Sequence, residues 1–294
     1  MATAQSGIFT EGSTAHYALE YSLGSDVSGP TLAKCLGEAR SGGGDANMVL
    51  AFSGLAWATL GGRVPDRLRS FEKLGSAPGP VAPATQRDLL FWLHGDALDD
   101  VFDAALAVGR AMAPVGKPAL DLRGFTYHDS RDLIGFIDGT ANPKGDARME
   151  AALIPDGGGG AFAMSQQWVT DLDAFNALPV AEQEGVVGRT KADSIELEGD
   201  AMPADSHVSR TDVKVDGVAQ KIWRRSFPYG DTVTKGLYFL SFACDLARFD
   251  VQLQRMYGVS GDGLKDRITE FTAAVTGSYW YAPSEDELAN ALGA

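Results

Sequence analysis

Two stretches in different halves of the chain, LLFWLHG at residues 89–95 and LYFLSFA at residues 237–243, decide the fold class. Each is a continuous apolar run of strand length, followed by a polar break and then by apolar residues with the period of an α-helix. These helical positions are Leu98, Val101, Phe102, Ala105, Val108 and Met112 after the first run, and Leu246, Phe249, Leu253 and Met256 after the second. A buried strand followed by an amphipathic helix in both halves indicates an internal duplication.

We therefore expect an α+β fold of two domains, each an antiparallel sheet covered by helices on one face. Residues 48–59 (MVLAFSGLAWAT) and 162–170 are expected to form further strands, and the Pro/Gly/Ala-rich residues 75–85 a surface loop. The glycine run at residues 157–160 lacks the pattern of a phosphate-binding loop and is interpreted as a linker. The boundary lies between residues 142 and 160, where Pro, Gly and charge cluster, so the domains are 1–150 and 151–294.

The composition excludes several classes of protein. The net charge of −14 at pH 7 argues against nucleic acid or an anionic membrane as a partner, because both need a basic surface. No apolar run is long enough to predict a membrane span, and residues 1–14 lack the pattern of a secretory signal. Cys35 and Cys244 are far apart and have no CxxC spacing, so we interpret them as reduced thiols. We expect a cytoplasmic protein.

The chain has four histidines, and no two of them have the spacing of a zinc or non-haem iron site. His94 lies inside the first apolar strand, where a core role is expected. His16 lies in an irregular N-terminal stretch and His128 in a turn. His207 lies in MPADSHVSR, residues 202–210, a polar segment that leads into a strand. Taken alone, this last position is more typical of a surface histidine than of a ligand.

The stretch GFIDGTANP, residues 135–143, places an acid directly after apolar residues. The Asp-Gly and Asn-Pro pairs are typical of a tight turn at the end of a strand-like approach. Phe136 and Ile137, however, extend the apolar surface up to the carboxylate of Asp138, and a buried acid is costly there unless it has a role. Both interpretations stay open from these residues alone.

A third stretch, QKIWRRSFPYG at residues 220–230, has the alternation of a strand. One face would carry Gln220, Ile222, Arg224 and Ser226, and the other Lys221, Trp223, Arg225 and Phe227. Because neighbouring residues point to opposite faces, only one of the two arginines can enter an interior site. By itself the segment is typical of an edge strand with exposed cations.

Together these stretches resemble the dye-decolourising peroxidase family, and within it the bacterial B-type group. The resemblance covers the C-terminal two-thirds of the chain in order, and GFIDGT is its most specific motif. It is carried by residues 125–143, 167–172 (QWVTDL), 182–197 (EQEGVVGRTKADSIEL), 206–213 (SHVSRTDV), 223–239 (WRRSFPYGDTVTKGLYF) and 271–283 (FTAAVTGSYWYAP). It implies two ferredoxin-like domains of the dimeric α+β barrel type, with non-covalent haem b held mostly by the C-terminal half.

The resemblance also implies the main site residues. His207 stands where the family has the axial ligand of the haem iron, and Asp138 and Arg224 stand at its catalytic carboxylate and arginine. The family pattern R-x-[SN]-x-P-[YF]-G selects Arg224 and Ser226, and strand alternation places both on one face. Arg225 should therefore point away from the site.

Further contacts follow from the same resemblance. Gly139 and Thr140 are expected to contact the haem, and Arg189 to pair with a propionate, because a guanidinium suits a carboxylate. Asp266 is the candidate that hydrogen-bonds the ring nitrogen of His207 not bound to iron. Since no CxxCH occurs, covalent c-type attachment is excluded.

These residues suit peroxide chemistry. Cleaving a peroxide bond needs a proton moved between its oxygens, which an aspartate can carry, and charge stabilised on the leaving oxygen, which an arginine can supply. The resemblance implies a peroxidase that uses H2O2 to oxidise dyes, phenols and other one-electron donors through a ferryl intermediate. A homo-oligomer is expected, since related proteins commonly associate.

Large dyes would not fit a closed site, so we hypothesise electron transfer to the surface through aromatic residues. The candidates, each also an ordinary packing residue, are Trp223, Tyr229, Tyr238, Trp280 and Tyr281.

Other functions remain open at this stage. The main alternative is a haem-handling protein, deferrochelatase-like or for haem storage and delivery, with incidental peroxidase activity. A chlorite- or coproporphyrin-haem enzyme on the same fold is disfavoured by GFIDGT and by the aspartate–arginine pair. A purely structural module is favoured least.

Overall fold

The first half of the chain alternates strands and helices, as the apolar run at residues 89–95 predicts. The structure, a computed structural model, describes residues 3–155 and 158–293. The elements before residue 156 are η1 (Ser6–Ile8), β1 (Ala15–Tyr21), α1 (Gly29–Ser41), β2 (Asn47–Phe52), α2 (Gly54–Thr59), β3 (Leu74–Gly75), β4 (Val81–Ala82), β5 (Leu89–Gly95), α3 (Leu98–Met112), β6 (Pro118–Phe125) and α4 (Ala147–Ala152).

The second half repeats the alternation, and its apolar run at residues 237–243 forms most of β12. The strand predicted at 162–170 is also confirmed, as β7. The elements are β7 (Ala161–Thr170), α5 (Leu172–Asn176), α6 (Val180–Val187), η2 (Gly199–Ala201), α7 (His207–Thr211), β8 (Lys214–Val215), β9 (Val218–Ala219), β10 (Trp223–Arg224), β11 (Phe227–Gly230), β12 (Lys235–Ala243), α8 (Ala247–Met256), η3 (Arg267–Glu270), β13 (Thr272–Ala274), β14 (Ser278–Ala282) and α9 (Glu285–Leu292).

The main sheet is antiparallel and closes on itself. Its strands run in the order β11-β6-β1-β5-β2-β14-β7-β12, and β12 pairs with β11 to complete the ring. Two seams join the halves, and in the described residues each rests on one residue pair. Tyr229 pairs with Gly124 between β11 and β6, and Tyr281 pairs with Phe52 between β14 and β2. Both halves therefore contribute strands to one barrel.

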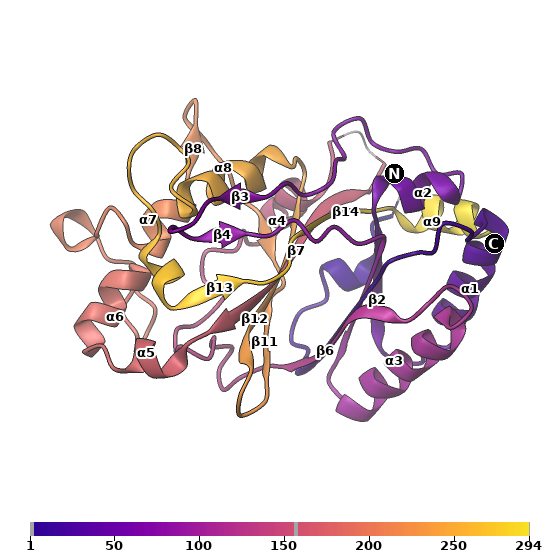
Figure 1. Cartoon of the computed structure of the whole chain (residues 1–294), viewed down its shortest axis with the longest axis horizontal. Helices are drawn as coiled ribbons and strands as arrows, with labels where there is room; N and C mark the ends of the chain where they lie inside the picture. Colours follow the sequence, from indigo (N-terminus) through magenta and orange to yellow (C-terminus); the bar gives the residue numbers. More distant parts are fainter. Residues whose placement is uncertain (1–2, 156–157, 294) are drawn as a thin grey trace.

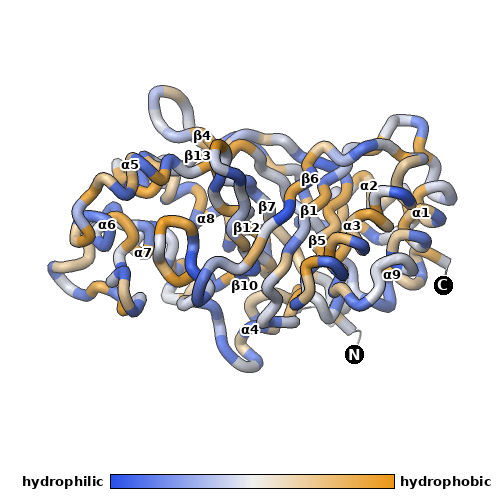
Figure 2. The backbone as a smooth tube through the Cα atoms, turned by 90° about the horizontal axis from the view of Figure 1, so that it is seen from below, coloured by the Kyte–Doolittle hydropathy of each residue, from blue (hydrophilic) through white to orange (hydrophobic). Residues whose placement is uncertain are grey.

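Two groups of helices lie at opposite ends of the molecule, with strands between them (Figure 1). α1, α3 and α9 gather near the C-terminus, and α5, α6 and α7 lie at the other end. The view turned by 90° shows the same separation (Figure 2). Within residues 3–155 and 158–293, no helix has both the length and the apolar character needed to cross a membrane.

Strand β5 is buried on both faces, which explains why its sequence is continuously apolar. One face packs against α1 and α3 and the other faces the barrel interior, through the sets Leu89, Phe91, Leu93 and Leu90, Trp92. His94 is fully buried, with Nδ1 2.7 Å from Ser13 Oγ and Nε2 2.9 Å from the carbonyl oxygen of Gly7. The predicted core role of His94 is confirmed.

Large side chains from both halves fill the barrel interior, among them Trp92, Trp223, Phe227, Tyr238, Phe242 and Trp280. His16 lies among them on β1, only 7% exposed, and its ring stacks on that of Phe227 with centroids 4.8 Å apart. The expectation that His16 lies in an irregular stretch is therefore wrong. The strand AHYALEY is hard to recognise from its sequence, because two of its polar residues, His16 and Glu20, are buried in the interior.

Two other local expectations are wrong. The strand expected at residues 48–59 ends at Phe52, because Ser53 caps helix α2 by accepting a hydrogen bond from the amide of Ala56 at 3.1 Å. His207 does not lead into a strand but begins α7, whose cap is Ser206. The surface loop expected at residues 75–85 contains a short hairpin, in which β3 and β4 pair.

The two halves also exchange packing elements. Helix α9 packs in the first-half core through Leu288, and Glu285 pairs with Arg40 at 2.6 Å. In the other direction, Arg69 binds Asp250 of α8 with both of its contacts at 2.6 Å. Residues 156–157, which include the start of the expected linker at 157–160, lie outside the described residues.

Candidate functional site

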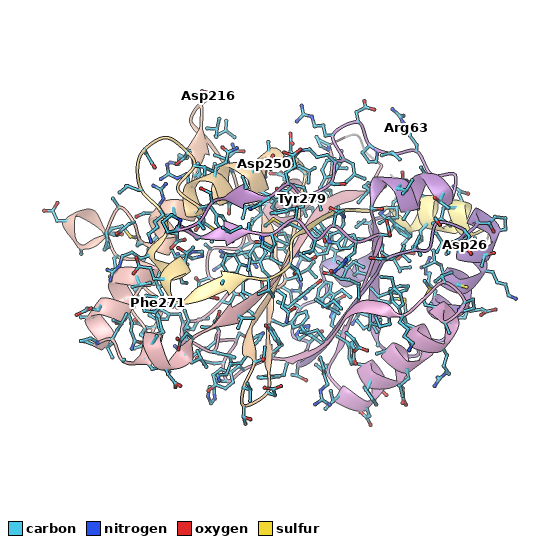
Figure 3. All side chains as sticks on the ribbon, in the orientation of Figure 1. Asp26, Arg63, Asp216, Asp250, Phe271 and Tyr279 are labelled. Atoms are coloured by element: carbon cyan, nitrogen blue, oxygen red, sulfur yellow. The ribbon has the colours of Figure 1, made fainter. Side chains whose placement is uncertain are left out.

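A large cavity lies between the second-half sheet and its helices. Its empty space is about 1620 Å³ when the solvent at its open side is counted, far more than a peroxide molecule needs. Strands β7 and β12, helices α7 and α8 and the loop at residues 132–141 form its walls. The wall is mainly apolar and includes Met164, Trp168, Phe175, Phe239, Leu253 and Phe271, the last labelled in Figure 3. Such a wall suits a flat apolar ligand with few polar groups.

The cavity brings together most of the residues predicted from the sequence. Those that line it are Asp138, Gly139, Thr140, Arg189, His207, Arg224 and Ser226. Of the face expected in residues 220–226, Gln220, Ile222, Arg224 and Ser226 all line this cavity. Lys221, expected on the opposite face, lines it as well, because the strand β10 begins only at Trp223. Arg225 points away, with its guanidinium over the rings of Trp92 and Trp223.

His207 is held by a buried carboxylate. Its Nδ1 lies 2.7 Å from Oδ2 of Asp266, which is fully buried, and the other oxygen of Asp266 accepts from the amide of Ile268 at 3.0 Å. A carboxylate accepts, so the ring is expected to donate through Nδ1 and to leave Nε2 with a free lone pair. The predicted partnership of His207 with Asp266 is therefore present as a contact.

A single amide side chain joins the two predicted catalytic segments. Nδ2 of Asn142 donates to the carbonyl oxygen of Arg224 at 2.9 Å, and the Arg224 amide donates to Oδ1 of Asn142 at 3.1 Å. Oδ1 of Asp138 accepts from the amide of Gly139 at 2.7 Å. The sequence indicated only a turn at Asn142, because a reciprocal contact with a distant backbone leaves no local pattern.

The approach to Asp138 is not a strand, contrary to expectation. Only isolated bridges occur there, one of which joins Arg131 and Ile137. The guanidinium of Arg131 instead organises the loop by donating to the carbonyl oxygens of Gly135 at 2.7 Å and Lys191 at 2.6 Å. Asp138 is therefore presented by an irregular loop, which Arg131 and Asn142 tie to the rest of the fold.

A second acid, Asp132, lines the same cavity and was not singled out from the sequence. Burial raises the pKa of Asp132 to about 6, and the negative charge of Asp138 adds to this, whereas a hydrogen bond from the Ile134 amide opposes it. The signal in the sequence was a second aspartate shortly before GFIDGTANP. Its burial depends on loop packing and cannot be inferred from spacing.

Three cations line the cavity, and two of them already have acidic partners. Arg189 pairs with Glu196 at 2.5 Å, and Lys221 with Asp212 at 2.6 Å. Arg224 forms no salt bridge in the part of the chain that the structure describes. Arg224 is therefore the cavity cation most available to a ligand, whereas Arg189 would have to share its charge between Glu196 and a propionate.

A second, more polar cavity adjoins the first. The two share Asp138, Gly139, Arg224 and Ser226. The hydroxyl of Ser226 is buried and has no hydrogen-bond partner within the described residues. An unsatisfied hydroxyl of this kind is costly, which favours a bound polar molecule beside it.

The five aromatic residues considered for electron transfer are all buried: Trp223, Tyr229, Tyr238, Trp280 and Tyr281. Each has a packing role, and none reaches the surface to meet a bulky donor directly.

The residues present fit a porphyrin iron better than a bare metal ion. No group of three or more His, Cys, Asp or Glu side chains in residues 3–155 and 158–293 could hold a metal ion. His207 is one oriented nitrogen donor facing a large apolar space, so the remaining ligands must come with the cofactor. This combination fits haem with one protein-derived imidazole better than a bare ion.

Comparison with known proteins agrees with this class. The model of the Dyp-type peroxidase C-terminal domain matches residues 129–287. A dye-decolorizing peroxidase of Mycolicibacterium paratuberculosis is 37% identical over 231 residues, which span 76% of this chain and 65% of that protein. The chain therefore covers slightly less than two-thirds of this relative's length. The chain belongs to the Dyp-type peroxidase family, a family of haem peroxidases.

Solved structures of similar proteins show the same fold. The dye-decolorizing protein from Vibrio cholerae has a TM-score of 0.89 at 36% identity, with 98% of this chain and 99% of that chain covered. A variant of DypB from Rhodococcus jostii, solved in complex with heme, has a TM-score of 0.89 at 31% identity, with 98% and 99% covered.

Proposed function

We propose that this protein is a haem b peroxidase that uses H2O2 to oxidise dyes, phenols and other one-electron donors. The observation that carries the proposal is that one cavity joins His207, backed by a buried carboxylate, with the Asp138 and Arg224 side chains. Each of these groups has an ordinary structural explanation alone, but an ordinary packing site does not need all of them together.

His207 would bind the haem iron through Nε2, because Nδ1 is engaged by Asp266. Gly139, Thr140 and Ser226 would contact the macrocycle, and Arg189 a propionate. When bound, the haem supplies the redox chemistry, namely two-electron reduction of peroxide followed by one-electron oxidation of donors. The imidazole–carboxylate pair makes the nitrogen that faces the cavity a stronger donor.

Asp138 and Arg224 would act on peroxide itself. Asp138 accepts the proton of the oxygen that attacks and returns it to the oxygen that leaves. Arg224 stabilises negative charge on the leaving oxygen, and it is suited to this because, unlike Arg189 and Lys221, it has no salt bridge in the described part of the chain. The polar second cavity reaches both residues, so peroxide and water can approach them apart from the apolar wall.

The test is stopped-flow mixing of the haem-loaded protein with peroxide. Asp138→Ala and Arg224→Ala should each lower the second-order rate constant by about 100-fold or more. Asp146→Asn, an exposed acid in the same segment, is the control and should react like the wild type. His207→Ala should lose the Soret band of bound haem. Unchanged rates in both site variants would exclude the assigned roles.

The same experiment separates the main alternative, a haem-handling protein. Such a protein would retain its Soret band but would not turn over donors after peroxide is added. Steady oxidation of a phenol, with loss in both site variants, favours the enzyme.

Three further proposals concern the whole protein. The halves 1–150 and 151–294 are proposed as two ferredoxin-like repeats, supported by the strand orders β6-β1-β5-β2 and β14-β7-β12-β11. A cytoplasmic location is supported by the free thiols of Cys35 and Cys244. A homo-oligomer is proposed from the exposed apolar residues of α3, which are Leu98, Phe102 and Leu106.

A further inference from the structure

Helix α7 carries a buried charge, Arg210, one turn after His207. The side chain of Arg210 is 1% exposed. Its guanidinium donates to both oxygens of Asp262, from Nη1 to Oδ2 at 2.7 Å and from Nη2 to Oδ1 at 3.1 Å. An arginine removed from water destabilises a fold unless its donors are satisfied. The bidentate contact and the burial indicate that the fold fixes the position of Arg210, unlike that of an arginine in an isolated surface ion pair.

The other partners of Arg210 lie in the same short segment. Its Nε and Nη2 both donate to the carbonyl oxygen of Arg255, at 3.1 and 3.0 Å. Nη2 also donates to Oγ of Ser260 at 3.2 Å and to the carbonyl oxygen of Leu264 at 3.1 Å. These partners of the Arg210 side chain all fall within residues 255–264, the segment that leads from α8 to Asp266.

Besides these contacts, the segment is held to α8 by backbone hydrogen bonds near its two ends, from the amide of Val259 to the carbonyl oxygen of Gln254 at 2.9 Å and from the amide of Asp266 to that of Met256 at 3.0 Å. Residues 258–265 are exposed, whereas Asp266 directly after them is fully buried. Gly258, Gly261 and Gly263 have φ of +70°, +86° and +74°. Glycines in an exposed loop leave the chain with high conformational entropy, which a fixed anchor must offset.

The contact is reciprocal. Arg255 of α8 donates from Nη2 to the carbonyl oxygen of Ser209 at 3.0 Å and from Nε to that of Arg210 at 3.3 Å. These are carbonyls of the last turn of α7, which a helix leaves without partners. Helix α7 is thus joined to α8 and to the loop that follows it by two arginines, Arg210 from α7 and Arg255 from α8.

We propose that Arg210 and Asp262 are positioning residues for His207. By tying residues 257–265 to α7, they hold the Asp266 carboxylate against the ring. The proposal rests on the proposed function, in which His207 carries the haem iron. We call Arg210, Asp262 and residues 257–265 the latch. Without it, the Asp266 carboxylate would move away from the His207 ring, and Nδ1 of His207 would bond to water instead. Nε2, the nitrogen that would bind iron, would then become a weaker donor.

The decisive variant is Asp262→Asn, which keeps the size of the side chain but removes its charge. Its matched control is Asp250→Asn, labelled in Figure 3, which also removes a carboxylate that binds an arginine, Arg69, through two contacts. Asp250 lies on α8 and contacts neither His207 nor Asp266. Both variants should lower stability, but only Asp262→Asn should change the state of His207.

The first readout is ring-nitrogen NMR of the protein without haem. The Nδ1–H proton of His207, bonded to a carboxylate, should give a slowly exchanging downfield signal in the wild type and in Asp250→Asn. In Asp262→Asn the signal should broaden or disappear, and the amides of residues 258–265 should lose protection from hydrogen exchange. Arg210→Lys should act in the same direction, because an ammonium cannot reproduce the guanidinium fork.

The second readout uses the haem-loaded protein. The iron–imidazole stretching frequency should fall in Asp262→Asn, and the rate constant with peroxide should fall by about 10-fold. An unchanged ring proton with unchanged loop protection in Asp262→Asn would overturn the latch. A changed ring proton with an unchanged iron–imidazole frequency would support the latch and would instead contradict the assignment of His207 as the ligand.

Discussion

At the scale of single residues, the acids of the cavity differ in what holds them. Asp266 is buried against an imidazole, and Asp138 accepts from a backbone amide, but Asp132 lies near another carboxylate. Burial and that like charge raise the pKa of Asp132 to about 6, so the folded protein binds its proton more tightly than the unfolded chain does. The contribution of Asp132 to stability is therefore fully present in acid, below its unfolded pKa near 3.8, and is lost as the pH rises through 6.

Asp132→Asn should consequently stabilise the haem-free protein at pH 7, by about 1–2 kcal/mol. The full shift would correspond to roughly 3 kcal/mol, and partial exposure reduces it. The amide oxygen of asparagine can still accept from Ile134, so the turn is retained. Urea unfolding of variant and wild type at pH 7 and pH 4 measures the difference. If the difference in unfolding free energy between Asp132→Asn and the wild type is as large at pH 4 as at pH 7, the charge of Asp132 is not its cause.

At the scale of elements, the barrel depends on close approach at its seams. A Cβ atom on Gly124 of β6 would lie 2.1 Å from the ring of Phe227 and 2.8 Å from the carbonyl oxygen of Pro228. These atoms belong to β11, whose contact with β6 joins the two halves. Glycine is required at this position because the neighbouring strand occupies the space of a side chain.

Gly124→Ala should therefore lower the free energy of unfolding by about 2 kcal/mol or more, since the Phe227 ring and the β11 backbone must both move. Gly109→Ala is the control, because Gly109 is exposed in α3 and its Cβ would meet no atom within 4 Å. Alanine there should raise stability by about 0.5–1 kcal/mol. Urea titrations of both variants test this, and equal effects would refute a special role for the seam.

At the scale of the whole molecule, the closed barrel buries titratable groups that an open sheet would leave exposed to water. Burial lowers the pKa of His16 to about 4 and that of His94 to about 3, and the charge of Arg225 adds to both shifts. The unfolded chain takes up these protons near pH 6.5, whereas the folded barrel resists them. The stabilisation is complete above pH 6.5 and is lost as the pH falls toward 4.

The protein should therefore lose stability steeply in mild acid. The variant His16→Phe keeps a flat ring stacked on Phe227. Between pH 6.5 and pH 4 its free energy of unfolding should fall by about 2–3 kcal/mol less than that of the wild type. Free energies of unfolding at several pH values, for the wild type and this variant, give the comparison. Parallel pH profiles would mean that His16 takes up its proton without opening the barrel.

The amino-acid sequence by itself determined the class of fold and the positions of the main elements. Continuous apolar runs at residues 89–95 and 237–243 have to be buried on both faces, and the helical patterns after them follow from local periodicity. Strand alternation also separated Arg224 from Arg225, since neighbouring side chains must point to opposite faces.

Only the tertiary structure decided which residues meet. Two contacts join segments that are distant in sequence: Asn142 with Arg224, and Arg210 with Asp262. The burial of Asp132 likewise depends on how its loop packs. The closure of two half-sheets into one barrel, through Gly124 and Tyr229 on one side, is of the same kind. Local patterns report which face of an element is apolar, but contacts between elements depend on how the chain packs as a whole, and no periodicity encodes them.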